Sequence, residues 1–241
     1  MSRRRTVSTR CVRMVRAHEG LRLEAYRCPA GVWTIGYGHT GPDVRAGMTI
    51  TINSYKQLPD HLVLHTNGAV FRQQNPSVLR APVLGFGEHG TVEGGLHVRT
   101  LGGEASQGVL LSESGNTRID YVDVRADAPG AGSANIRDNG LRIMNSNDVR
   151  IDRVYVENYD WAVWVEESPG FQIGRAEVST YSLAVRIKGG CSQGRIHGGH
   201  VYKAGPNSAY LPGYNGLLME NQSASDDLRI SNFTVDDAGE H

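Results

Sequence analysis

A carboxyl group near the start of the chain has the surroundings that a general acid needs. Glu19 stands at the end of an expected helix and is followed closely by Leu21 and Leu23. Apolar neighbours raise the pKa of a carboxyl group, and a raised pKa keeps a proton available for general acid catalysis. A surface salt bridge is the ordinary alternative for an isolated glutamate, so the assignment depends on the residues around it.

The elements that would position Glu19 are a helix and a hairpin. Apolar residues recur at roughly helical spacing over residues 8–18, and Gly20 is expected to end this helix. Two strand-like runs follow at residues 21–26 and 32–37, separated by a turn that contains proline and glycine. The sequence therefore predicts a small helix-plus-hairpin segment.

Residues 18–40 read HEGLRLEAYRCPAGVWTIGYGHT and resemble the phage-type lysozymes (endolysins, glycoside hydrolase family 24), in which EGLRL, a turn and TIGYGH occur in this order. The resemblance places the catalytic glutamate of that family on Glu19, its usual aspartate position on Cys28 and its threonine on Thr34. It implies that Glu19 is the acid and that Thr34 holds the attacking water. Some phage lysozymes carry cysteine at the middle position. Cys28 would act as a base only if a positive neighbour such as Arg27 ionised its thiol.

The resemblance covers about residues 5–51, the opening segment of a lysozyme domain. The helical lobe that forms the far wall of the lysozyme cleft has no counterpart in the sequence. Because a glycan must be held on both sides to react, either the rest of the chain supplies a second wall or the segment is vestigial. We expect a truncated lysozyme-like segment over residues 1–51 and a second domain over residues 52–241.

The second part of the chain repeats at about 22 residues. Ala162 follows Gly140 by 22 residues and Ala184 follows Ala162 by 22, while the steps from Gly108 to Gly140 and from Ala184 to Gly216 are 32 residues and carry loops. Each unit holds an alternating apolar pair and a spaced apolar triplet, for example Val163/Val165 and Ile173/Ala176/Val178. Alternation points one face of a strand inward. The pattern predicts a mainly β fold, a right-handed parallel β-helix; a β-propeller would need units about twice as long.

Outward-facing residues of successive units fall into columns. One column contains Arg118, Arg150, Gln172, Arg195 and Arg229, and another contains Asp123, Tyr155, Glu177, His200 and Thr234. In its coil pattern the region resembles the pectate-lyase-like β-helices of polysaccharide lyases, glycosidases and phage tailspikes, which implies a shallow polysaccharide groove. The candidate substrate-binding residues are Asp123, Tyr155, Glu177, His197 and His200, with Trp161 and Trp164 as surfaces for sugar stacking. The alternative is a polar solenoid face without ligand, covered by arginine stems.

The composition argues against several kinds of partner and cofactor. The 25 basic and 25 acidic side chains balance, so no global field attracts nucleic acid, and no apolar run is long enough to span a membrane. No apolar core follows the basic start MSRRR, so we expect no secretory signal. Three widely spaced cysteines show neither a disulfide framework nor metal-ligand spacing, and His197 and His200 lack a third ligand. We expect no metal and no cofactor.

Three functional hypotheses follow. The first is a phage-type muramidase that hydrolyses the β-1,4 linkages of peptidoglycan (MurNAc–GlcNAc), with Glu19 as general acid, located in the host cytoplasm or on the virion. The second is a tailspike-like glycan-binding β-helix that carries an inactive lysozyme segment. The third is a β-helix lyase or hydrolase of exopolysaccharide. In each case the partner is peptidoglycan or another polysaccharide, and a homo-oligomer is compatible with the fold.

Overall fold

The computed structural model describes residues 21–27, 33–36, 39–40, 49–52, 56–66, 68–73, 82–101, 107–127, 139–203, 215–220 and 227–236. These residues are mainly β and contain strands but no helix. The helix expected over residues 8–18 lies outside the described residues. Among them, no helix has the length and apolar character that crossing a membrane requires.

The strands fall into an N-terminal group and a long stacked series. The first group is β1 (Leu21–Arg27), β2 (Trp33–Gly36) and β3 (His39–Thr40). The series begins with β4 (Thr49–Ile52), β5 (Lys56–Gln57), β6 (Val63–His65), β7 (Val70–Gln73), β8 (Pro82–Phe86), β9 (Thr91–Glu93), β10 (Leu96–Thr100) and β11 (Gln107–Ser112). It continues with β12 (Arg118–Ala126), β13 (Asn139–Met144), β14 (Arg150–Glu166), β15 (Gln172–Lys188), β16 (Arg195–Ile196), β17 (Gly199–Lys203), β18 (Asn215–Glu220), β19 (Arg229–Ile230) and β20 (Phe233–Asp236).

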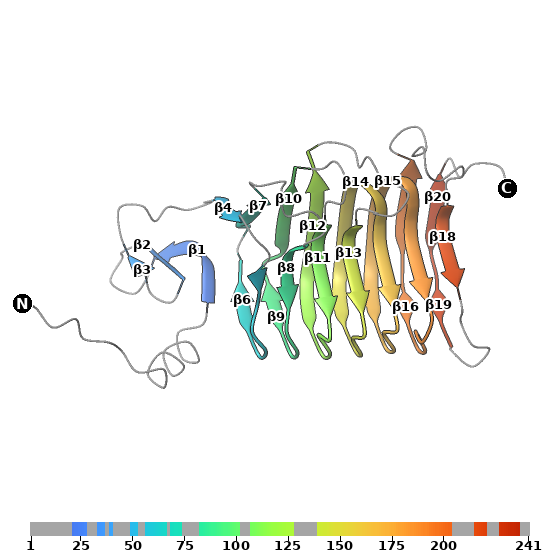
Figure 1. Ribbon diagram of the computed structural model, residues 1–241, viewed down its shortest axis with the longest axis horizontal. Coiled ribbons are helices and arrows are strands. Elements are labelled where there is room, and N and C mark those ends of the chain that lie inside the picture. Colours follow the sequence, from blue (N-terminus) through green and yellow to red (C-terminus); the bar gives the residue numbers. More distant parts are fainter. Residues whose placement is uncertain are drawn as a thin grey trace, which may run out of the picture.

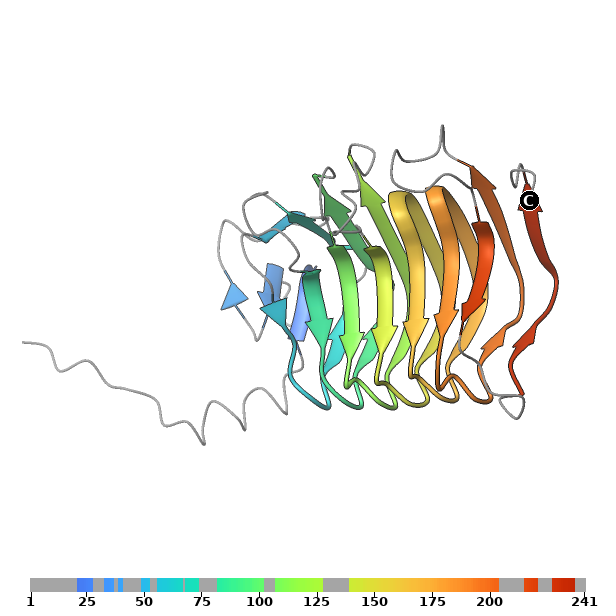
Figure 2. The ribbon, with the colours of Figure 1, turned by 45° about the vertical axis from the view of Figure 1, so that its right-hand side comes forward.

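Strands of successive units pair in parallel, coil on coil (Figure 1). Between β14 and β15 the partners Ile151↔Ile173 and Val163↔Val185 are each 22 residues apart. The same column continues from β15 to β16 with Ile173↔Ile196. Figure 2 shows the coils side by side along the stack. This stacking is consistent with the parallel β-helix expected from the sequence, and the observed register matches the repeat of about 22 residues.

The interior of the stack is one continuous apolar core. The alternating pairs predicted from the sequence are buried in four units: Val109/Leu111, Leu141/Ile143, Val163/Val165 and Val185/Ile187. The fifth pair departs from the prediction, because Leu217 is only partly buried and Met219 is 54% exposed. The outer side of β18 has no strand partner among the described residues, so this unit is covered from one side only.

The small residues that open each unit are required by packing inside the coil. A Cβ atom on Gly140 would lie 2.3 Å from Val156 Cγ1 and 2.8 Å from the backbone oxygen of Ala162. A Cβ atom on Gly108 would meet Val124 equally closely. Approaches this short are repulsive, so these positions cannot take a larger residue unless the coil shifts.

A ladder of buried serines connects the turns between adjacent coils. Ser114, Ser146 and Ser168 are all fully buried. The backbone N–H of Ser114 donates to Ser146 Oγ at 2.9 Å, and the backbone N–H of Ser146 donates to Ser168 Oγ at 3.2 Å. Each hydroxyl in turn donates to a backbone carbonyl, as Ser168 Oγ does to Glu166 at 2.7 Å. Hydrogen bonds therefore satisfy the polar groups that the tight turns bury.

The N-terminal strands form the expected hairpin and join the first end of the stack. β1 and β2 pair in antiparallel fashion, with Arg27 opposite Trp33, which confirms the hairpin predicted from the sequence. β1 also pairs in parallel with β6 through Leu21↔Leu64, and Figure 1 places β1–β3 at the end of the stack opposite β18–β20. β4 spans the predicted domain boundary after residue 51 and pairs with β7.

Candidate functional site

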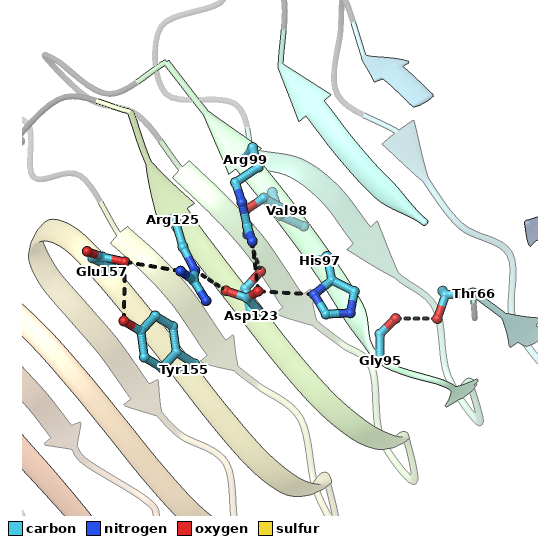
Figure 3. Close-up of polar contacts among 9 residues, drawn as sticks. All are labelled: Thr66, Gly95, His97, Val98, Arg99, Asp123, Arg125, Tyr155 and Glu157. Atoms are coloured by element: carbon cyan, nitrogen blue, oxygen red, sulfur yellow. Dashed lines mark hydrogen bonds and ion pairs between the residues drawn. The ribbon is translucent and has the colours of Figure 1, made fainter. Parts of the chain in front are cut away.

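A network of charged side chains lies on the outer face of β10 and β12, with Asp123 at its centre (Figure 3). The Asp123 side chain accepts hydrogen bonds from Arg99 Nη2 at 2.8 Å and from Arg125 Nε at 2.8 Å. His97 Nδ1 lies 3.0 Å from Asp123 Oδ2. Because Asp123 is only 3% exposed, its charge is balanced by the two guanidiniums rather than by solvent.

The network fixes the ionisation of Asp123. Burial on its own would raise the pKa of this carboxyl, but the hydrogen bonds from His97, Arg99 and Arg125 outweigh burial and hold the pKa well below its usual range. Asp123 is therefore an anion throughout the physiological pH range. It can orient His97 or accept a hydrogen bond, but it cannot serve as a proton donor.

The next coil extends the network through Tyr155 and Glu157. The Tyr155 hydroxyl donates to Glu157 Oε2 at 3.2 Å, and the Arg125 guanidinium lies 4.4 Å from the centre of the Tyr155 ring. Burial and a hydrogen bond with Tyr202 raise the pKa of Tyr155, so its phenol remains protonated. The column predicted from the sequence is present, since Asp123 pairs with Tyr155 and Tyr155 pairs with Glu177 in register.

Tyr155 and Glu177 line a shallow pocket of about 220 Å³ on this face. Its other lining residues are Tyr121, Arg153, Val154 and Arg175. Arg175 Nε donates to Glu177 Oε1 at 2.6 Å, and the Arg153 guanidinium lies 5.2 Å from the centre of the Tyr121 ring. An aromatic ring beside charged hydrogen-bonding groups is a suitable surface for a sugar.

Neither of the two predicted histidines lines this pocket, although His200 pairs in register with Glu177. His197 lines a second pocket of about 220 Å³, together with Arg118, Arg150, Ile151, Asp152, Gln172 and Gly174. His200 lies in the last coils, where its Nε2 is 2.6 Å from Asp236 Oδ2 and its ring lies beside that of Tyr202. The five candidate binding residues therefore lie in three kinds of place: the charged network around Asp123, two pockets, and an exposed contact between His200 and Asp236. Within the described ranges, no group of three or more His, Cys, Asp or Glu side chains is placed to hold a metal ion.

The tryptophans proposed for sugar stacking are already in contact with arginines. The Arg142 guanidinium lies 4.0 Å from the centre of the Trp164 ring, and that of Arg186 lies 4.6 Å from it. These arginines come from the neighbouring coils on either side of Trp164. Trp161 packs edge-on against Trp164 with ring centres 5.0 Å apart. A sugar could stack on Trp164 only by displacing a guanidinium, so this cluster stabilises the sheet face.

Glu166 completes this second cluster. It accepts a hydrogen bond from Lys188 Nζ at 2.6 Å and lies 3.4 Å from Arg142 Nη2. Burial opposes ionisation, but the hydrogen bond and charge of Lys188 and the charge of Arg142 outweigh it and lower the pKa of Glu166. The negative charge of Glu166 is thus balanced by Lys188 and Arg142 of the neighbouring coils.

Of the three predicted catalytic residues, the structure describes only Thr34. It lies on β2, where it pairs with Tyr26 of β1 and Thr40 of β3, and its side chain is 3% exposed. Glu19 and Cys28 lie outside the described residues. A buried threonine can hold an enclosed water, but it does not by itself form part of an open cleft.

Sequence reasoning did not single out His97, Arg99, Arg125 or Glu157. The signal was present for the first two, because the apolar residues Leu96 and Val98 alternate with them, and alternation predicts that His97 and Arg99 face outward. His97 pairs in register with Asp123, so extending the Asp123 column by one coil toward the N-terminus would have found it. The ion network itself depends on side-chain rotamers, which the repeat does not encode.

The fold and the faces described above define a mainly β protein of stacked parallel strands with a hairpin segment at one end. The phage lysozyme family model matches residues 16–76, a range that includes β1–β7. A stretch of 34 residues is 53% identical to an endolysin of Acyrthosiphon pisum secondary endosymbiont phage 1 and covers 14% of this chain and 23% of that endolysin. The chain thus spans less than a quarter of the curated relative that it matches. No solved structure matches the chain.

Proposed function

We propose that this protein is directed to bacterial peptidoglycan by its lysozyme-like N-terminal segment, and that the coil stack forms a rigid glycan-binding body behind that segment. The observation that carries the proposal is the phage lysozyme match over residues 16–76, and the 53% identity to an endolysin across 34 residues supports it. The pairing of β1 with β6 supports a continuous body in which the hairpin is attached to the first coils.

The chemistry proposed for the segment is hydrolysis of the β-1,4 linkages between MurNAc and GlcNAc. Glu19 donates a proton to the leaving oxygen, and Thr34 positions the water that attacks the sugar. Cys28 occupies the position between them and contributes as a base only in its thiolate form. In this proposal, the host cytoplasm and the virion are the places where the protein meets its substrate.

A second candidate function is glycan binding without hydrolysis, by a tailspike-like stack whose lysozyme segment is vestigial. Two observations favour it: the Thr34 side chain is 3% exposed, and the match covers only 23% of the endolysin. A separate candidate is a lyase or hydrolase site on the coil stack itself, for which Tyr155 and Glu177 in their shared pocket are the residues to test.

We further propose that the coil stack, over residues 52–241, is a right-handed solenoid related in architecture to the pectate-lyase-like β-helices. The physical support is general: a crossover between parallel strands of one sheet is right-handed in about 98% of cases. Open ends of such stacks offer unpaired strand edges, so association into a homo-oligomer fits the same architecture. Sedimentation analysis together with an experimental structure would test both points.

Lysis of purified peptidoglycan tests the proposed hydrolysis. The full chain is expected to reduce the turbidity of a cell-wall suspension, and Glu19→Gln is expected to abolish this activity because the amide cannot donate the proton. Glu24→Gln is a matched control, since it removes a carboxylate of the same segment that the proposal does not use. If wild type and both variants bind peptidoglycan without lysing it, the function is binding rather than hydrolysis. Lysis that persists in Glu19→Gln would exclude Glu19 as the acid.

A further inference from the structure

A row of arginines crosses the coil stack, and three of its members form no ion pair with a described residue. In register, Arg118 pairs with Arg150, Arg150 with Gln172, and Gln172 with Arg195. Arg99, Arg142 and Arg186 lie elsewhere on the stack and each forms an ion pair with a carboxylate. No such pair involves Arg118, Arg150 or Arg195 within the part of the chain that the structure describes. Three guanidiniums of this row thus have no ion-pair partner among the described residues, whereas Arg229, which follows Arg195 in register, pairs with Asp227.

Two of these arginines line a hollow in that face. The pocket of about 220 Å³ is lined by Arg118 and Arg150 together with Asp152, Gln172 and His197. Gly174 contributes no side chain to the pocket, and a Cβ atom there would lie 2.5 Å from the backbone oxygen of Asp152. The coil geometry therefore keeps this position a glycine and leaves the space between Asp152 and His197 open.

The lining of the pocket has the chemistry of a carboxylate site within a sugar-binding surface. Adjacent strands lie about 4.8 Å apart, so the side chains of Arg118 and Arg150 project from neighbouring rungs. A guanidinium binds a carboxylate through two parallel hydrogen bonds, and two guanidiniums outweigh the single negative charge of Asp152. Asp152, Gln172 and His197 offer acceptors and donors for hydroxyl groups.

We infer that this pocket, which we call the arginine pocket (Arg118, Arg150, Asp152, Gln172, Gly174 and His197), binds the carboxylate of an acidic sugar in a glycan that lies across the coils. The inference rests on the proposed glycan-directed function and names the chemical class of the ligand. A neutral glycan would leave the guanidiniums without a partner. A long polyanion such as nucleic acid does not fit a chain whose 25 basic and 25 acidic groups balance, because the positive potential is local to this row.

Two sources can supply such a carboxylate: the lactyl group of muramic acid in peptidoglycan, or a uronic acid of another polysaccharide. The probes are matched in pairs that differ in the carboxylate. GlcNAc–MurNAc is compared with the neutral disaccharide GlcNAc–GlcNAc (N,N′-diacetylchitobiose), and a hexuronate trisaccharide is compared with its methyl ester. Binding to the full chain is measured by NMR titration or calorimetry at low salt. The pair in which the acid binds more tightly identifies the source.

Wild type is expected to bind at least one acidic probe ten-fold more tightly than its neutral counterpart. The double variant Arg118→Gln/Arg150→Gln is expected to lose at least ten-fold in affinity for that acid while leaving the neutral sugar unaffected. Arg72→Gln is the matched control, because Arg72 is half exposed, pairs with Asp127 and lies outside the pocket. Circular dichroism confirms that each variant keeps its β content.

Equal affinities for acid and neutral probes, unchanged binding in the double variant, or no binding of either acid would overturn the inference. These outcomes are separable from the proposed function. If the double variant still sediments with peptidoglycan, the proposed function stands but the arginine pocket is not needed for it. The protein could instead bind hexuronate tightly and in an Arg150-dependent way but neither lyse peptidoglycan nor sediment with it. That result would support the arginine pocket and exclude peptidoglycan as the partner.

Discussion

At the scale of single residues, Asp123 shows how the coil stack handles a buried charge. Three side chains from two strands converge on its carboxylate, and the shortest contacts are the 2.8 Å hydrogen bonds from Arg99 and Arg125. A buried carboxylate with such partners contributes to stability only while it is ionised, because protonation removes the charge that holds the cations in place.

This residue makes a prediction about stability and pH. The folded state lowers the pKa of Asp123, so its stabilisation is fully present above the unfolded value of about 3.9 and is lost as the pH falls below that value toward the lower folded pKa. Asp123→Asn is expected to lower the free energy of unfolding by about 3 kcal/mol at pH 7, since it leaves Arg99 and Arg125 without their anion. The difference from wild type should shrink at pH 3, as measured by urea denaturation.

Asp127→Asn serves as the control for this measurement. Asp127 is 41% exposed and pairs with Arg72, and an exposed pair of this kind contributes about 0.5 kcal/mol. A difference between wild type and Asp123→Asn that stays constant from pH 7 to pH 3 would contradict the assigned ionisation.

Sequence reasoning reached part of the candidate site. The repeat placed Asp123, Tyr155 and Glu177 in one column, as the register shows, because alternation and unit length together fix which residues face outward. It could not separate their environments: Asp123 is buried in an ion network, whereas Tyr155 and Glu177 line a pocket. That separation depends on which long side chains of neighbouring coils reach across, and the spacing of residues carries no information about it.

At the scale of one coil, the recurrent small residue at the start of each unit reflects the narrow interior. Gly140 faces Val156 across the coil, and Ala162 takes the equivalent place in the next unit, where it is fully buried. The sequence showed the spacing of these residues, and the structure supplies the reason for their size.

Replacing one of these glycines tests the packing argument. Gly140→Ala is expected to destabilise the protein by about 2 kcal/mol, because the added Cβ would lie 2.3 Å from Val156 Cγ1 and the coil must open to admit it. Gly198→Ala is the matched control, since the nearest atom to its Cβ would be Asn232 O at 3.7 Å, an ordinary contact. Thermal unfolding followed by circular dichroism measures both, and equal melting temperatures would refute the steric explanation.

At the scale of the whole molecule, each coil contacts the coils on either side, so the stack is quasi-one-dimensional. The repeat in the sequence was sufficient to predict this architecture, because every unit repeats the same inward pattern. It was misleading at the last unit: Met219 sits at an inward position of the pattern but is 54% exposed. A local pattern cannot show whether another coil lies beyond it, and burial in a solenoid depends on that neighbour.

The same dependence predicts a gradient of local stability along the stack. Backbone amides of β14 and β15 lie between coils on both sides, whereas those of β18–β20 have described partners on one side only. In hydrogen exchange, peptides from residues 150–188 are therefore expected to be protected at least ten-fold more strongly than peptides from residues 215–236, because opening an end coil breaks one interface and opening a central coil breaks two. Equal exchange rates in the two regions would mean either that the stack unfolds as a single unit or that a further partner covers its end. Hydrogen-exchange rates measured over a range of protein concentrations separate these two cases, because self-association would protect the last coils more at high concentration.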